Sequence, residues 1–257
     1  DKNAEVYNSL FKLGFGFVEV GTITPLKQYG NPKPRVFRLV EDEALINRLG
    51  FNNQGAEIVK ERIKRNTKLG LLGINVGPNK DSSDRLNDYL IGLKTFYDEA
   101  DYITINISSP NTENLRIFHE GDKLQDLLKS IMEERKNLKS NIPIAVKVSP
   151  DISEDQVNQV SEILLDHEIK AIIVSNTSEA TRDKLSNIQR HQKGGLSGKP
   201  IEEKSNILIN EFYKLLKGKI KIIGVGGVDS GQSAYDKFIA GADFIQLYTG
   251  MVFNVPI

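Results

Sequence analysis

The sequence has no cysteine among its 257 residues. Disulfide bonds, cysteine-ligated metals and a thiolate nucleophile are therefore all excluded. Histidine is scarce as well, because only His119, His167 and His191 are present and they are scattered along the chain. No two of them stand at a spacing typical of metal ligands, so we expect no metal site.

Net charge and long apolar runs are also lacking. The 34 basic residues balance 34 acidic ones, so the chain has no overall field to attract nucleic acid, and we expect no nucleic-acid partner. The longest apolar runs, such as Leu71–Gly77, have the length of a strand, and no segment resembles a signal peptide or a membrane-spanning helix. Since there is no low-complexity tract or Pro/Gly/Ser-rich linker either, we expect a single domain over residues 1–257.

The sequence does contain a regular alternation of two element types. Seven short runs rich in β-branched residues are apolar along most of their length, as parallel strands covered on both faces are: Gly16–Gly21, Leu72–Val76, Tyr102–Ile107, Ile144–Val148, Ala171–Val174, Lys221–Val225 and Phe244–Leu247. Amphipathic stretches with helical spacing lie before and between them: Ala4–Leu13, Asn53–Lys68, Asp84–Glu99, Leu124–Leu138, Ser153–His167, Ile201–Lys217 and Ser230–Ala240. This alternation predicts βαβ units and a parallel sheet.

Seven strands suit an open doubly wound sheet, whereas a closed (β/α)8 barrel needs eight. Because the chain begins just ahead of the predicted helix Ala4–Leu13, a strand immediately upstream would complete a barrel. We therefore expect an α/β fold of the (β/α)8 TIM type, truncated at both ends, with the first strand and the last helix missing. Two long connections, 22–71 and 176–221, predict functional loops, and residues 36–40 of the first predict a small hairpin.

Nearly every predicted strand ends in a group that can make specific hydrogen bonds: Thr22, Asn75, Asn106, Lys147, Asn176, Gly226-Gly227 and Tyr248-Thr249. In a barrel the strand C-termini meet at one mouth, where active sites of this fold lie. For any single residue, capping of a turn is the simpler interpretation. Seven strands that behave alike indicate a binding site.

Two glycine-rich segments, 194–198 and 224–228, predict a phosphate site. Glycine lets backbone N–H groups approach an anion, and barrels often bind phosphate after their last two strands. The segment Tyr248-Thr249-Gly250 would complete this cradle. The pattern favours a cofactor or substrate that carries a phosphate.

Lys147 interrupts an apolar strand, where a charged residue is rarely buried unless it is paired. A lysine at a strand end or edge is the structural alternative. A functional lysine here would be either a cation beside an electron-rich cofactor or a Schiff-base residue. The sequence alone leaves both open.

The segment Asn106-Ile-Ser-Ser-Pro-Asn111 is the strongest single signal. Asparagine offers both hydrogen-bond senses and suits a planar, amide-rich ligand, while an activated serine can act as a nucleophile or a base. His119 follows ten residues after Ser109, but no carboxylate is evident to orient it. A hydrolytic triad is therefore poorly supported.

With these motifs the chain resembles the dihydroorotate dehydrogenases, and within them the class 2, quinone-linked, membrane-associated branch. The resemblance covers the whole chain and is carried by Asp1-Lys2, Glu19-Val-Gly-Thr22, Asn47–Asn53, Gly73-Ile-Asn75, Asn106–Asn111, Ala145-Val-Lys147, Ser175-Asn-Thr177, Gly194–Gly198, Gly224–Gly227 and Tyr248-Thr-Gly250. It implies oxidation of (S)-dihydroorotate to orotate in pyrimidine (UMP) biosynthesis. It also implies FMN as hydride acceptor and a quinone as final electron acceptor.

The resemblance further implies a role for individual residues. Ser109 would be the catalytic base that removes the C5 proton, before a hydride passes from C6 to flavin N5. FMN would be held by Lys2, Thr22, Asn75, Asn106, Lys147, Ser175, Gly198, Gly227, Tyr248 and Thr249. Dihydroorotate would be bound by Lys2, Asn47, Arg48, Leu49, Gly50, Phe51, Asn106, Asn111, Asn176 and Thr177.

Ser109 decides the branch, because the cytosolic branch of the family uses a cysteine at this position. A serine base needs a proton relay, for which Thr112 or an ordered water is our hypothesis. Glu113-Asn114 stand where the family usually has Pro-Gly, which indicates a loop of different mobility. Ser175 and Thr249 replace a Thr and a Ser, and both keep a hydroxyl.

The class 2 resemblance implies a peripheral membrane protein of the bacterial cell membrane or, in a eukaryote, of the mitochondrial inner membrane. Attachment would use N-terminal helices that this chain does not contain. Three alternatives remain at this point. They are a phosphate-binding lyase or aldolase barrel with Lys147 as the Schiff base, an FMN barrel acting on another pyrimidine, and a non-catalytic binding protein.

Overall fold

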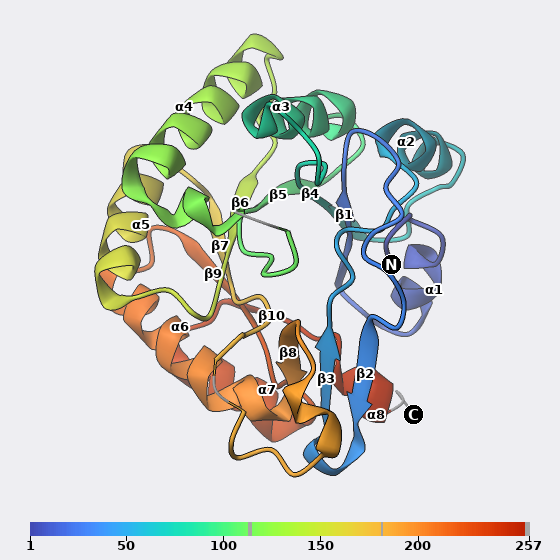
Figure 1. Cartoon of the computed structure of the whole chain (residues 1–257). Coiled ribbons are helices and arrows are strands. Elements are labelled where there is room, and N and C mark those ends of the chain that lie inside the picture. Colours follow the sequence, from blue (N-terminus) through green and yellow to red (C-terminus); the bar gives the residue numbers. More distant parts are fainter. Residues whose placement is uncertain (113–114, 181, 255–257) are drawn as a thin grey trace. The chain divides into compact units, whose positions relative to one another are not determined.

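The computed structural model describes residues 1–112, 115–180 and 182–254 (Figure 1). The chain divides into two compact units. The first unit comprises Asp1–Asn31, Gly50–Asn106 and Gln125–Val146, and the second comprises Pro32–Leu49, Ile107–Leu124 and Lys147–Ile257. The expected departure at Glu113-Asn114 lies outside the described residues.

The first unit contains three parallel strands, β1 (Phe17–Ile23), β4 (Leu71–Val76) and β5 (Tyr102–Asn106). Its helices are α1 (Tyr7–Lys12), α2 (Ala56–Lys64), α3 (Arg85–Phe96) and most of α4 (Gly121–Asn137). A Cβ on Gly73 would lie 2.1 Å from the ring of Tyr102. This glycine in β4 therefore makes room for an aromatic side chain of the next strand.

The second unit contains the parallel strands β7 (Ala171–Val174), β9 (Lys221–Val225) and β10 (Phe244–Gln246). Its helices are α5 (Glu154–Asp166), α6 (Glu202–Leu216), α7 (Gly231–Ala240) and α8 (Gly250–Phe253). The predicted cap of α5 is present, because Ser153 and Gln156 form a reciprocal capping box.

The seven predicted strands form one sheet with the order β1-β4-β5-β6-β7-β9-β10, in which β6 is Ile144–Val148. The predicted strands and helices are confirmed, and most bounds move by only one to four residues. The first strand, β1, ends two residues later than predicted and so includes Thr22. Short 3₁₀ helices lie at Val40–Asp42, Leu115–His119, Ile188–His191 and Lys199–Ile201.

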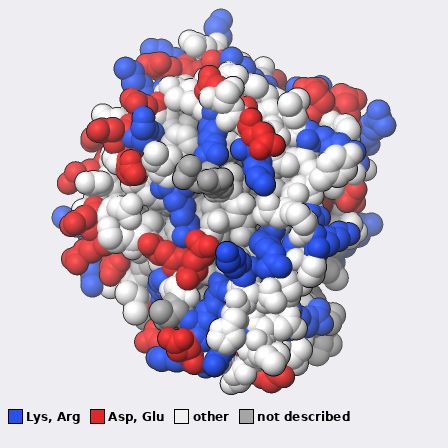
Figure 2. Space-filling view, in the orientation of Figure 1, with Lys and Arg blue, Asp and Glu red and all other residues white. Residues whose placement is uncertain are grey.

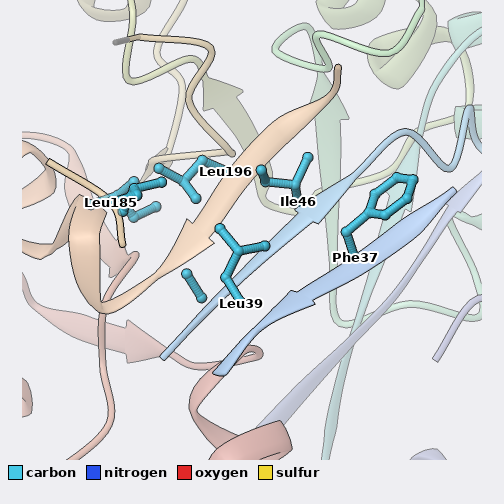
Figure 3. Close-up of a cluster of buried hydrophobic side chains, with 7 residues drawn as sticks. Phe37, Leu39, Ile46, Leu185 and Leu196 are labelled. Atoms are coloured by element: carbon cyan, nitrogen blue, oxygen red, sulfur yellow. The ribbon is translucent and has the colours of Figure 1, made fainter. Parts of the chain in front are cut away.

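A second, three-stranded sheet belongs to the second unit. A hairpin is present but extends beyond the predicted residues 36–40, because it pairs β2 (Val36–Leu39) with β3 (Ala44–Asn47). β3 also pairs with β8 (Gly195–Gly198). Phe37, Leu39, Ile46, Leu185 and Leu196 form its buried apolar cluster (Figure 3). The sequence did not predict β8 as a strand, because glycine is depleted in strands.

Basic and acidic side chains are interspersed over the face of the molecule seen in Figure 2. This distribution agrees with the balanced composition of the chain. Within residues 1–112, 115–180 and 182–254, no helix combines the length and the apolar character that crossing a bilayer requires.

Candidate active site

Three of the predicted strand-end residues meet in the first unit. The hydroxyl of Thr22 donates to Oδ1 of Asn75 at 2.6 Å. The amide nitrogen of Asn106 donates to the Thr22 hydroxyl at 2.9 Å and to Oδ1 of Asn75 at 3.1 Å. All three side chains are buried, so these contacts fix their orientation in a region largely free of competing water.

Sequence reasoning missed a fourth member of this cluster, Glu19 of β1. Its carboxylate accepts hydrogen bonds from Asn75 Nδ2 at 2.9 Å, Thr104 Oγ1 at 2.8 Å and Tyr102 OH at 3.1 Å. The signal was available, since Glu19 is a charged residue inside a largely apolar strand, as Lys147 is. The argument applied to Lys147 identifies Glu19 equally well.

Three other predicted ligand contacts also belong to the first unit. Lys2 is half-buried ahead of α1. Gly50 and Phe51 have positive φ angles of 68° and 51°, and their carbonyls accept hydrogen bonds from Gln28 at 2.9 and 3.4 Å. The amide of Asn53 adds a second bond to the Phe51 carbonyl at 2.8 Å. The conformation of this loop is thus held through its backbone.

The proposed base lies in the second unit, directly after β5. Ser109 is 5% exposed, and its Oγ accepts a hydrogen bond from the backbone N–H of Asn111 at 3.2 Å. The amide of Asn111 in turn donates to Oδ1 of Asn47 at 3.3 Å, so two predicted substrate contacts lie together beside the base.

The loop after β7 supplies two more predicted contacts. Asn176 Nδ2 donates to the hydroxyl of Ser108 at 2.9 Å, and Asn176 Oδ1 accepts the Thr177 N–H at 2.8 Å. A Cβ on Gly195 would lie 1.8 Å from Thr177 Oγ1. The glycine of β8 therefore allows Thr177 to pack against this strand. Ser175 is buried, and its N–H donates to the carbonyl of Val225 at 2.9 Å.

His119 does not take part in a triad. Its Nε2 accepts the Ser149 N–H at 3.2 Å, and its Nδ1 lies 3.1 Å from the Arg116 carbonyl, so Nδ1 carries the proton. Burial lowers the pKa of His119 to about 4, which keeps the ring neutral near pH 7. The His119 side chain thus holds the end of the loop that carries Ser109. It forms no hydrogen bond with Ser109 that would make it a catalytic partner.

Arg116 is a second residue that sequence reasoning missed. Its guanidinium donates to the carbonyls of Ser108 and Thr177, both at 3.4 Å, and pairs with Asp151 at 3.4 Å. It therefore joins the base segment to the loop that carries Asn176 and Thr177. Arg116 is half-buried in the short 3₁₀ helix Leu115–His119, and a single arginine there carries no sequence signal that separates this role from an ordinary surface position.

The glycine cradle is present in the second unit. Gly198 and Gly227 have positive φ angles of 100° and 78°. A Cβ would lie 2.3 Å from the Glu43 carbonyl at Gly198 and 2.4 Å from Glu202 at Gly227, so neither position tolerates a side chain. Thr249 is buried, and its hydroxyl donates to Ser197 at 2.9 Å.

The groups of this cradle suit a phosphate. A small cavity beside it is lined by the two glycines together with Lys199, Asp229 and Gly250. Backbone amides of glycine turns, a hydroxyl and an ammonium group are the donors that phosphate oxygens accept from. Tyr248, the neighbouring residue in the predicted cradle, is 64% exposed.

The remaining predicted residues are also in the second unit. Lys147 is the one residue of β6 that is not fully buried. Arg48 donates to Gln192 Oε1 at 3.2 Å and to the Lys193 carbonyl at 3.1 Å, and its guanidinium lies 4.5 Å from the centre of the Phe37 ring. Leu49 is half-buried. Among the described residues, no group of three or more His, Asp or Glu side chains is arranged to hold a metal ion.

Comparison with known proteins agrees with this chemistry. The model of the dihydroorotate dehydrogenase family matches residues 1–257. The dihydroorotate dehydrogenase (quinone) of Bartonella tribocorum is 48% identical over 261 residues, which cover all of this chain and 72% of the relative. That of Pasteurella multocida is 47% identical over 263 residues, with coverage of 100% and 77%.

Solved structures give the same result. A crystal structure of the Eimeria tenella DHODH with ferulenol superimposes with a TM-score of 0.96 at 36% identity, and covers 100% of this chain and 75% of that one. The ligand-free Eimeria tenella structure gives the same score and identity, with 78% of that chain covered. The expected fold class, an α/β barrel of the (β/α)8 type, is confirmed by these matches. The chain therefore belongs to the dihydroorotate dehydrogenase family of flavin-dependent oxidoreductases, and its curated relatives place it in the quinone-linked class.

Proposed function

We propose that this chain oxidises (S)-dihydroorotate to orotate, with FMN as the bound flavin and a quinone as the final electron acceptor, in pyrimidine biosynthesis. The observation that carries the proposal is the setting of Ser109. This serine is buried, receives a backbone hydrogen bond at its Oγ, and stands beside paired asparagine amides. Family membership supports the substrate and the acceptor.

Ser109 is the base in this proposal, and it removes the proton from C5 of the substrate. Negative charge develops on Oγ as its own proton leaves, and the Asn111 N–H already points at that atom from 3.2 Å. A hydrogen bond to the charged form favours that form. The relay for the serine proton is Thr112, which is buried three residues further on, or an ordered water.

Substrate binding is assigned to amide groups because dihydroorotate contains ring N–H groups, carbonyls and a carboxylate. Asparagine can serve the donors and acceptors of such a ring at once. In the second unit this set is Asn47, Arg48, Leu49, Asn111, Asn176 and Thr177, and in the first unit it is Lys2, Gly50, Phe51 and Asn106.

Bound FMN supplies the hydride acceptor. The residues that would hold it in the first unit are Lys2, Thr22, Asn75 and Asn106, and in the second unit they are Lys147, Ser175, Gly198, Gly227, Tyr248 and Thr249. The glycine cradle fits the phosphate of this cofactor, because Gly198, Gly227 and Lys199 line one small cavity. Lys147 contributes a positive charge, which stabilises negative charge that develops on an electron-rich ring.

Quinones reside in membranes, so we further propose that the protein works as a peripheral membrane protein. The site would be the bacterial cell membrane or, in a eukaryote, the mitochondrial inner membrane. The relatives named as quinone-linked support this location. Sedimentation of the full-length protein with quinone-containing vesicles tests it, and a protein that stays in the supernatant would contradict it.

The reaction is tested by adding dihydroorotate anaerobically to full-length protein that carries FMN. We expect loss of the flavin absorbance in the wild type. In Ser109→Ala the rate of flavin reduction should fall by about a hundredfold to about ten-thousandfold, the usual contribution of a general base. FMN should stay bound, because Ser109 is not one of its proposed contacts.

Ser186→Ala is the matched control, since Ser186 is exposed and its side chain lies outside the proposed site. A Ser109→Ala protein that reduces flavin at the normal rate would refute the base assignment. A wild type whose bound FMN is not bleached would refute the substrate. The Schiff-base alternative predicts that borohydride traps substrate on Lys147 and that the purified protein is colourless.

A further inference from the structure

Glu19 is not among the residues assigned to ligand contacts. It nevertheless belongs to the cluster of buried polar side chains formed by Thr22, Asn75 and Asn106 in the first unit. Three side chains donate to its carboxylate, namely those of Asn75, Thr104 and Tyr102. Glu19 is one of five consecutive register positions that pair β1 with β4, and its partner there is Gly73. The carboxylate is thus held in place by neighbouring strands of the same unit.

A carboxylate accepts hydrogen bonds and donates none, so the Asn75 atom facing Glu19 must be the NH₂ group. Asn75 Oδ1 is thereby directed at Thr22 and Asn106, from which it accepts at 2.6 and 3.1 Å. Asn106 must then turn its own NH₂ group toward this pair. Its amide oxygen is left on the opposite side of the side chain.

The chain of bonds therefore has only one direction. Asparagine amides are nearly symmetric in shape, and either orientation fits the same space. What selects one orientation is the acceptor-only group at the end of the chain. Tyr102 and Thr104 do not set this direction, because hydroxyl groups can both donate and accept.

We propose that Glu19 is a positioning residue that sets the hydrogen-bond polarity of Asn75, Thr22 and Asn106, so that Asn106 presents an acceptor oxygen to a ring N–H. This inference rests on the proposed function, in which both FMN and dihydroorotate carry ring N–H groups between carbonyls. Without Glu19 the amides can turn over, and Asn106 would then direct its NH₂ group at a donor. The site keeps its shape but loses its match to the ligand.

The test compares two replacements of Glu19 by titration of the apoprotein with FMN. Glu19→Met keeps a similar volume but removes the acceptor. The dissociation constant for FMN should rise by about tenfold to about a hundredfold, as expected for the loss of a hydrogen bond to a charged group. Glu19→Gln keeps the size of the side chain but can turn either its oxygen or its NH₂ group toward Asn75, so it should recover only part of the affinity.

A merely structural role for Glu19 gives a different result. In that case Glu19→Met would bind FMN like the wild type, and the proposal would be overturned. If Glu19→Gln bound FMN as tightly as the wild type, an acceptor-only group would not be needed at this position, which also overturns the proposal. Tyr102→Phe is the matched control and should leave the affinity unchanged.

A measurement on the wild type covers the case in which Glu19→Met does not fold. In the NMR spectrum of the FMN-loaded protein, the Asn106 side-chain NH₂ protons should show nuclear Overhauser effects to the Thr22 methyl group. If these effects were absent because the Asn106 carboxamide is turned the other way, the proposed direction of the hydrogen bonds would be refuted. Failure of the proposed function can be told apart from failure of this proposal. If dihydroorotate did not bleach the bound flavin, the FMN affinities and the NMR result would still test the role of Glu19.

Discussion

Acidification from pH 7 toward pH 4 should destabilise this chain through one buried side chain, His119. Its ring is 1% exposed, and both nitrogens face backbone groups, the Ser149 N–H and the Arg116 carbonyl. Protonation of Nε2 would place two donors against each other at 3.2 Å. Burial, the largest cause, lowers the pKa of His119 from its ordinary value of 6.5 to about 4.

The sign and the size of the effect follow from proton linkage. The unfolded chain binds this proton near pH 6.5 and the folded chain only near pH 4, so stability is lost as the pH falls between these values. The contribution is fully present above pH 6.5. At about 1.4 kcal/mol per pH unit, the difference corresponds to about 3 kcal/mol. This is a large fraction of the stability of a typical domain, about 5 to 15 kcal/mol.

Urea unfolding at a series of pH values from 7.5 to 4.5 measures this contribution directly. His119→Gln can still accept the Ser149 N–H but cannot be protonated in this range. We expect a lower stability than the wild type at pH 7.5 and a shallower loss on acidification. His191→Gln, at an exposed position, is the control and should follow the wild type. If His119→Gln lost stability with the same slope as the wild type, the assigned neutral histidine would be refuted.

Two further predictions concern the second unit. Gly195→Ala should destabilise the protein by about 1 to 3 kcal/mol in urea unfolding, because the new Cβ would lie 1.8 Å from Thr177 Oγ1. Gly231→Ala is the control and should keep the wild-type stability, because a Cβ there meets nothing within 4 Å. Equal stability of the two variants would contradict the packing argument. Burial lowers the pKa of Lys237 to about 8, so the wild type should gain stability as the pH rises from 8 toward 10.5, and Lys237→Met should lack this gain. Unfolding at pH 8 and pH 10 measures the difference, and identical slopes for the two proteins would count against a buried ammonium group.

The barrel strands could be predicted from the sequence because their apolar runs are continuous. Ile144–Val148 and Ala171–Val174 were predicted with their observed bounds, and the helices between strands follow from apolar spacing. β8 could not be predicted in this way. Its pairing with β3 depends on a backbone approach that only a glycine such as Gly194 permits, since a Cβ there would lie 2.3 Å from the Asn47 carbonyl. Such an approach is a property of the fold and not of the local sequence.

In the candidate site, too, some residues could be predicted from the sequence and others could not. Strand-end positions identified Thr22, Asn75 and Asn106 as neighbours, because parallel strands end at a common edge. Position alone does not identify the groups that orient them. Glu19, Arg116 and His119 act through hydrogen bonds to residues 8 to 85 positions away or to a nearby backbone carbonyl, and such partners emerge only from the folded chain.

Both units solve the same chemical problem at their asparagines. A carboxamide can turn over at little steric cost, so a site that reads a ligand through amides needs a group that fixes each orientation. In the first unit this group is an acceptor that cannot donate, Glu19, acting on Asn75 at 2.9 Å. In the second unit it is a donor that cannot accept, the Thr177 N–H, acting on Asn176 at 2.8 Å. The Asn176 NH₂ group must then face Ser108, as it does at 2.9 Å. A backbone N–H cannot be removed by side-chain exchange, whereas a carboxylate can, so the first unit is where a single substitution can change amide polarity without changing the fold.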